Sequence, residues 1–281
     1  MQTIIPNQSK FNEITQKIKQ DGVKNLHFLS DFDRTLTYGT LIGKKTSSII
    51  SILRDNHYLT ANYSQKAQAL FDKFYKWEID PDLSISQKKQ IMQKWWRSHF
   101  ELLIQSGLHK ADLESIVEKG NLVLRKGVRE FLKKLNKLNI PIIIFSSSGA
   151  GEAIEIFFEK NKINFQNVYF VINRFRWNKS GKAKEVVEPI IHSFNKDETL
   201  LKDFKPIFEA VKDRKNVILM GDNLGDLGMV EGFDYNNLFT IGFLNSCHDQ
   251  LEQAFYKSFD VIFKGDGALE SAKLVSWFLG S

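Results

Sequence analysis

Cysteine is nearly absent from this chain, since Cys247 is the only one among 281 residues. A single thiol excludes an internal disulfide framework and a cysteine-rich metal site, which is typical of a reducing compartment. No apolar run reaches the roughly 18 residues that a membrane-spanning helix needs, and the first residues lack the cationic start and apolar run of a secretory leader. We therefore expect a cytoplasmic protein with no membrane partner.

Low-complexity tracts, long charge runs and internal repeats are also missing. The chain is 42% hydrophobic and 26% charged, with only 5 prolines, which is the composition of a folded globular protein. The net charge of +6 raises the question of nucleic acid. However, a turn-like "NKSG" interrupts the densest basic stretch, residues 174–184, so we interpret it as a solvated hairpin and expect no nucleic-acid partner.

Short apolar runs alternate with segments of helical periodicity along most of the chain. Nearly unbroken apolar strands separated by helices are typical of a parallel sheet that is covered on both faces. The sequence therefore predicts an α/β fold with a Rossmann-like parallel sheet. The expected strands are residues 26–30, 140–146, 168–173, 216–222, 238–244 and 260–263.

One long interval breaks this alternation. Residues 40–127 contain helix-like patterns and polar turns, and the interval is too long for a simple crossover. We expect residues 1–39 and 128–281 to form the catalytic core and residues 40–127 to form an inserted α-helical cap, called the cap segment below.

Polar side chains follow the ends of three of the expected strands. In an open α/β sheet, ligands bind outside the carboxyl ends of the strands, so these residues should meet at one edge. Alternation along an extended chain places Asp31 and Asp33 on one face, where their charges repel unless a cation lies between them. Such oxygen ligands suit Mg²⁺, and an aspartate can attack phosphorus while a second carboxyl handles the proton. The residues in question are Asp31, Asp33, Ser146, Ser147, Asp222 and Asp226.

Four motifs in order carry a family resemblance. "DFDRTLT", "IIIFSS", a lysine and "GDNLGD" resemble the motifs of the haloacid dehalogenase superfamily. The stretches "FSSSGAGE", "HSFNKDE", "GDNLGDLGMVEG" and "IGFLN" resemble the cytosolic pyrimidine 5′-nucleotidase family, type III, over essentially the whole chain. The resemblance implies that Asp31 is the nucleophile and a metal ligand, and that Asp33 is the general acid and base and offers its backbone carbonyl to Mg²⁺. It also implies that Ser146 and the backbone of Ser147 bind phosphate, and that Lys196 bridges nucleophile and phosphate.

The resemblance extends to the remaining site residues. It implies that Asp222 completes the metal ligands and that Asp226 positions the metal-bound waters. It further implies that Glu78 and Trp95, in the cap segment, contact the base of the substrate. Each has a plainer interpretation: Asp226 could cap a helix, Trp95 could pack in the cap, and Glu78 could start a turn.

These features together predict a Mg²⁺-dependent, monomeric 5′-nucleotidase that acts through an aspartyl-phosphate on small nucleoside monophosphates. Pyrimidine nucleotides such as CMP and UMP are the favoured substrates, and 7-methylguanosine monophosphate is a second candidate because adjacent tryptophans can stack on a cationic base. One alternative is the same chemistry on phosphoserine or a sugar phosphate. Another is a non-catalytic protein that binds a phosphorylated ligand.

Overall fold

The structure is a computed structural model, and it describes residues 1–41, 44–55, 58–80, 82–119, 122–245 and 249–279. Cys247 lies outside these ranges. Within them, a seven-stranded sheet has the order β1-β11-β10-β9-β2-β5-β6. β1 runs antiparallel to β11, and the other neighbouring strands are parallel. The strands are β1 (Gln2–Ile4), β2 (Leu26–Ser30), β5 (Ile142–Ser146), β6 (Val168–Ile172), β9 (Asn216–Gly221), β10 (Asn237–Leu244) and β11 (Val261–Lys264).

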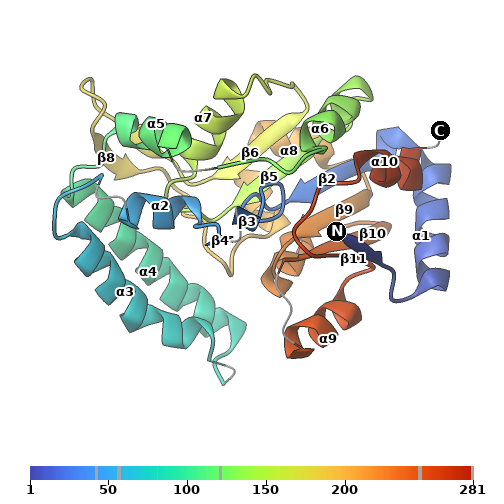
Figure 1. Ribbon diagram of the computed structural model, residues 1–281, viewed down its shortest axis with the longest axis horizontal. Coiled ribbons are helices and arrows are strands. Elements are labelled where there is room, and N and C mark those ends of the chain that lie inside the picture. The colour runs from blue at the N-terminus through green and yellow to red at the C-terminus, as the bar shows by residue number, and fades with distance from the viewer. Residues whose placement is uncertain (42–43, 56–57, 81, 120–121, 246–248, 280–281) are drawn as a thin grey trace.

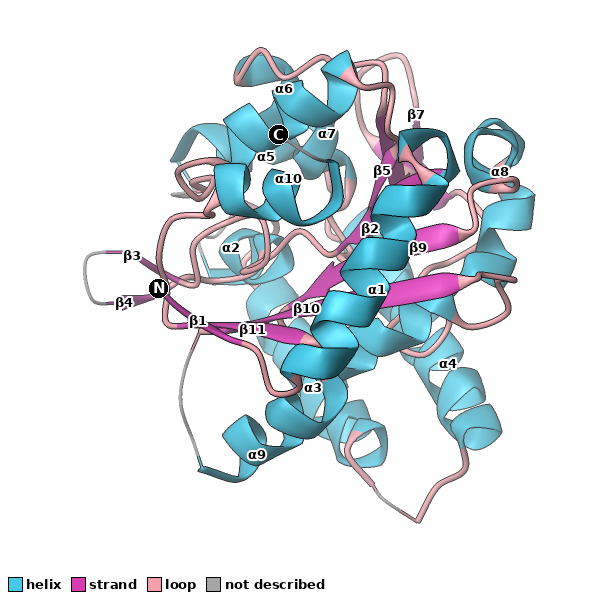
Figure 2. Cartoon of the chain, turned by 90° about the vertical axis from the view of Figure 1, so that its right-hand side faces the viewer, coloured by secondary structure: helices cyan, strands magenta, loops and turns pink. Residues whose placement is uncertain are grey.

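Apolar residues on both faces explain why the sheet is buried between helices. Alternate side chains of β5 enter different clusters: Ile142 and Ile144 join one, and Ile143 and Phe145 join the other. The first cluster receives residues of helices α1, α6, α7 and α10, and the second receives residues of α8 and α9, so helices lie on both faces (Figure 2). The bounds are α1 (Gln8–Asp21), α6 (Val128–Lys137), α7 (Glu152–Lys160), α8 (Lys205–Val211), α9 (Asp249–Ser258) and α10 (Ser271–Leu279).

The cap segment is mainly helical in its described part. A short antiparallel pair, β3 (Thr40–Leu41) and β4 (Lys44–Lys45), precedes helices α2 (Ile49–Asp55), α3 (Tyr63–Glu78), α4 (Ile85–Gln105) and α5 (Lys110–Lys119). Helices α3 and α4 lie side by side, away from the sheet (Figure 1). Ser84 starts α4 with a capping box, in which its hydroxyl accepts from the Gln87 amide and the Gln87 side chain accepts from the Ser84 amide. The domain boundaries at 39/40 and 127/128 remain a prediction.

The six strands expected from the sequence are all present, so the predicted α/β fold is confirmed. The basic stretch forms the expected hairpin, with β7 (Phe175–Trp177) antiparallel to β8 (Ala183–Val186). Two short helical segments follow the loops that carry Lys196 and Asp222: η2 (Glu198–Asp203) and η3 (Leu224–Val230). Among the described residues, no helix combines the length and the apolar character that crossing a membrane requires.

Candidate active site

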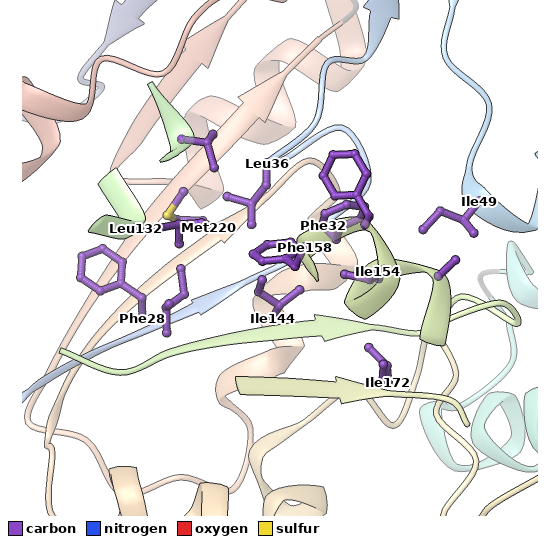
Figure 3. Close-up of a cluster of buried hydrophobic side chains, with 14 of the residues drawn as sticks. Phe28, Phe32, Leu36, Ile49, Leu132, Ile144, Ile154, Phe158, Ile172 and Met220 are labelled. Atoms are coloured by element: carbon purple, nitrogen blue, oxygen red, sulfur yellow. The ribbon is translucent and has the colours of Figure 1, made fainter. Parts of the chain in front are cut away.

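The carboxyl ends of the adjacent strands β9, β2 and β5 bring the predicted polar residues to one cavity. Directly after β2, Asp31 and Asp33 line this cavity of about 750 Å³, whereas Phe32 between them is fully buried. The Phe32 ring packs against Phe157 and Phe158, with centroids 5.8 and 6.1 Å away. Figure 3 shows Phe32 beside Phe158. The alternation expected from the sequence is therefore present, and burial of Phe32 fixes the direction of both carboxylates.

Three carboxylates form a compact acidic cluster. Asp31, Asp222 and Asp226 each offer an oxygen, and these oxygens lie within 4.8 Å of one another. Asp226 tucks against the end of β9, where a Cβ on Gly221 would stand 2.5 Å from the Cβ of Asp226. Burial, reinforced by the charge of Asp31, raises the pKa of Asp222 to about 8, and burial raises that of Asp31 to about 6. A nearby cation would lower these pKa values and so favour the ionised carboxylates.

Lys196 supplies one positive charge at this cluster. Its Nζ lies 2.5 Å from Asp31 Oδ1 and 3.0 Å from Asp226 Oδ1. Burial disfavours the ammonium, but the charges of Asp226 and Asp31 outweigh it and hold the pKa of Lys196 above its ordinary value. The lysine follows a tight turn in which the Asn195 side chain accepts from the His192 amide and donates to the Ile190 carbonyl.

The Asp33 carboxyl is buried beside the charge of Asp31. Burial raises the pKa of its carboxyl to about 7, and the negative charge of Asp31 adds to this effect, while the Arg34 cation opposes it. The carboxyl of Asp33 lies outside the acidic cluster formed by the other three aspartates. A raised pKa of this kind suits the general acid and base role that the sequence predicts for Asp33.

The loop after β5 forms another wall of the cavity. Ser146 ends the strand, its hydroxyl accepts from the Ser148 amide at 3.2 Å, and Ser147 follows it. The buried Asn173 at the end of β6 holds this loop, because its Nδ2 donates to the carbonyls of Ser147, Ser148 and Ile191. The serine hydroxyl and loop amides thus stand where a phosphate would need donors.

The cap segment closes the cavity from the other side. Glu78 at the end of α3 accepts from the Ser193 hydroxyl at 2.8 Å, and burial raises its pKa. Trp95 of α4 lines the cavity but is 7% exposed, and its ring stacks on Phe74 with an interplanar angle of 9°. The Nε1 of Trp96 donates to the Ser147 carbonyl at 2.9 Å, which joins the cap segment to the loop after β5.

All nine residues that the sequence singled out line this one cavity, and their individual roles remain predictions. Sequence reasoning gave no role to Asn173 or Arg34, and it considered Trp96 only as the neighbour of Trp95 that could stack on a cationic base. Asn173 was visible as the polar end of an expected strand, and Arg34 as the residue after the aspartate pair. The contact of Trp96 had no signal, because it depends on how α4 lies against the core.

The comparisons with known proteins agree with this geometry. The family model described as pyrimidine 5′-nucleotidase (UMPH-1) matches residues 34–277. The chain belongs to the pyrimidine 5′-nucleotidase family. It is thus a member of a family of phosphoric monoester hydrolases, as predicted from the sequence.

Named relatives and solved structures support the same assignment. The 7-methylguanosine phosphate-specific 5′-nucleotidase of Gallus gallus is 31% identical over 92% of this chain and 89% of its own, and that of Homo sapiens is 30% identical over 93% and 87%. The crystal structure of cytosolic 5′-nucleotidase IIIB bound to cytidine superposes with a TM-score of 0.86 at 26% identity, covering 98% of this chain and 93% of that one. A phosphoserine phosphatase, with a TM-score of 0.50 at 16% identity, shares the haloacid dehalogenase-like fold alone.

Proposed function

We propose that this family member hydrolyses nucleoside 5′-monophosphates by transferring the phosphoryl group to Asp31. The observation that carries the proposal is the position of the Asp31 carboxylate, which shares the acidic cluster with Asp222 and Asp226 and pairs with Lys196 in the cavity that Glu78 and Trp95 also line. A phosphoryl group and a base can therefore be held in one cavity.

In the proposed reaction, Asp31 takes the phosphoryl group and Asp33 gives and takes the protons. A carboxylate oxygen of Asp31 forms a bond to phosphorus, the bond from phosphorus to the ribose O5′ breaks, and the protonated Asp33 gives its proton to O5′. A water then attacks phosphorus, Asp33 takes the proton of that water, and inorganic phosphate leaves Asp31. Throughout, Lys196 and the donors of the loop after β5 balance the phosphoryl charge.

The acidic cluster fits Mg²⁺. Hard divalent cations take carboxylate oxygens, and burial together with the charges of neighbouring carboxylates raises the pKa of Asp31 and Asp222, so a cation among them would favour their anionic forms. Asp31 and Asp222 would bind the ion, together with the Asp33 carbonyl, and Asp226 would orient its waters. When bound, Mg²⁺ neutralises phosphoryl charge.

We infer that pyrimidine nucleotides such as CMP are substrates, and we keep 7-methylguanosine monophosphate as a second candidate. The cavity wall carries Phe71, Tyr75, Trp95 and Trp96 together with the Glu78 carboxylate. Aromatic faces stack on any base and attract a cationic one, and a carboxylate accepts from a ring N–H or amino group. The relatives' names mention 7-methylguanosine phosphate, and the solved relative holds cytidine. A cytoplasmic location and a monomeric state complete the proposal.

A phosphate-release panel tests the proposed activity. CMP, UMP, 7-methylguanosine monophosphate, AMP, phosphoserine and a sugar phosphate would each be offered with and without Mg²⁺. We expect turnover of the first three, and loss of turnover by at least about a thousandfold in Asp31→Asn with its fold retained in circular dichroism. Substantial turnover by Asp31→Asn would refute the assignment of the nucleophile.

The base contacts need a separate comparison. Glu78→Gln and Trp95→Ala are expected to raise KM for the preferred nucleotide and to reduce the preference among bases, since both residues line the cavity. Glu101→Gln, an exposed change on the same helix as Trp95, is the matched control. Unchanged selectivity in both cap variants would favour a phosphatase of other small phosphomonoesters.

A further inference from the structure

A fully buried arginine, which does not line the cavity, contacts the two residues that directly follow the aspartate pair. The side chain of Arg125 has no exposed surface, and its guanidinium lies over the rings of Tyr38 and Phe243. All five of its N–H groups are used: they donate to the carbonyls of Thr35, Arg34 and Gly267, and to side-chain oxygens of Asp266 and Asn245, at 2.5 to 3.0 Å. Burying a guanidinium is tolerable only when its donors are satisfied in this way.

One of these contacts, together with a hydrogen bond from Asn245, holds Arg34 in an unusual backbone conformation. Arg34 has a φ of 61°, in the left-handed region that residues with a side chain rarely adopt. Its carbonyl accepts from Arg125 Nη2 at 2.7 Å and from Asn245 Nδ2 at 2.9 Å. Its own amide donates to the Thr37 hydroxyl at 2.8 Å. Such strain persists only where the surroundings fix it, and here hydrogen bonds on both sides of Arg34 do so.

This conformation has a consequence for the site. Arg34 follows Asp33 directly, and its side chain lines the cavity with Nε 3.6 Å from Asp222 Oδ2. A change in the φ of Arg34 would therefore move the carboxyl that carries the proton and the cation beside Asp222 together. Arg125 is not among the residues that line the cavity or form the acidic cluster. Its charge attracts Asp222, and Arg125→Lys would keep that charge, so a change in the hydrogen bonds of Arg125 acts on the site through this segment.

The same group of residues joins both connections between core and cap segment. Asp266, besides pairing with Arg125, accepts from the amides of Gly39 and Thr40. The segment that leads into the cap segment lies beside the segment that leads out of it, because Thr37 forms an antiparallel β-bridge with Leu124. Both connections between core and cap segment are therefore hydrogen-bonded close to Arg34, where the segment that begins at Asp31 ends.

We propose that Arg125 is a positioning residue for phosphoryl transfer: with Asn245 it holds Arg34 in the left-handed conformation that sets the positions of Asp33 and the Arg34 guanidinium. The inference rests on the proposed roles of Asp31 and Asp33. It assigns Arg125 an effect on the chemical step that a residue serving only the fold would not have.

The test compares two arginines that both bind carbonyl groups. Arg214 donates to the carbonyls of Ala210, Val23, Leu26 and Asn139, away from the cavity. Arg125→Lys and Arg214→Lys are both expected to lower the thermal midpoint. Only Arg125→Lys should lower kcat, by about 10- to 100-fold with KM changed less than about threefold, because misplacement acts on the chemical step. A kcat for Arg125→Lys equal to that of Arg214→Lys would overturn the proposal.

A second variant covers the case in which Arg125→Lys does not fold. Asn245→Ala removes one of the two donors to the Arg34 carbonyl and is expected to lower kcat about tenfold, again with little change in KM. Its crystal structure should show Arg34 leaving the left-handed region. If the unaltered protein releases no phosphate, the proposed function fails, and this crystal structure still decides the present inference: Arg34 retaining a positive φ would overturn it.

Discussion

Replacing Asp33 by Asn is expected to inactivate the protein and stabilise it at the same time. The change removes the proton that the leaving O5′ needs, so kcat should fall by about 10²- to 10⁴-fold. It also removes a buried ionisable group whose pKa is raised from 3.8 to about 7, mainly by burial. The Asn side chain has the same shape, and its oxygen can keep the hydrogen bond from the Ile49 amide.

The sign and size of the stability effect follow from proton linkage. Well below pH 3.8 the carboxyl is protonated in both the folded and the unfolded chain, so the variant should be no more stable there. As the pH rises, the unfolded chain loses the proton first, and the wild-type protein loses stability until the folded carboxyl also ionises near pH 7. The rise of the pKa from 3.8 to about 7 already includes the attraction to Arg34 and corresponds to about 4 kcal/mol, so we expect a stabilisation of at most about 4 kcal/mol above about pH 8.

Urea unfolding in EDTA checks this expectation. The free energy of unfolding would be measured at about pH 4.5 and pH 8 for the wild type, Asp33→Asn and the control Asp234→Asn, whose carboxyl is 92% exposed. The gap between Asp33→Asn and wild type should widen with pH, while the control shows no such trend. An equal or lower stability of Asp33→Asn at the higher pH would refute the reasoning.

Three further outcomes follow from the same cavity. Lys196→Met leaves Asp31 and Asp226 without their buried partner, so the free energy of unfolding in EDTA should fall by about 3 to 5 kcal/mol at pH 8, and by less at pH 5, in urea titrations. Removal of divalent ions by EDTA should reduce phosphate release from CMP to background, and added Mg²⁺ should restore it; full activity in EDTA would contradict the metal assignment. Asn173→Ala frees the loop after β5, so a calorimetric stability loss of about 1 to 3 kcal/mol and a raised KM are expected, and an unchanged KM would show that the loop keeps its shape without Asn173.

The central strands could be predicted from sequence because both of their faces are buried. Both faces of β5 and β9 are covered, so their apolar runs are nearly unbroken and easy to recognise. The short β1 escaped prediction because an edge strand of three residues, paired on one side, needs no such run. The cap segment was visible only as an interval without strands, and its helix pairing had to come from the structure.

The site also contains residues that the sequence could predict and residues that it could not. Asp31, Asp33 and Asp222 were predictable because topology alone brings the ends of adjacent parallel strands together. Arg125 was not, since its role arises from five contacts with segments that are distant in sequence. A residue whose partners are mostly backbone carbonyls leaves no pattern of side-chain types to recognise.

The contacts between cap segment and core give the cavity a property that neither part has alone. Trp96 donates to the carbonyl of Ser147, and Glu78 accepts from Ser193, three residues before Lys196. Lys89 of α4 pairs with Asp197, directly after that lysine, at 3.2 Å. The residues that would recognise a base are therefore bonded to the two loops that would hold the phosphate. If Glu78 contacts the base as proposed, a base that displaces Glu78 from Ser193 would act on the loop carrying Lys196, and we expect base recognition and phosphoryl transfer to be coupled through these bonds.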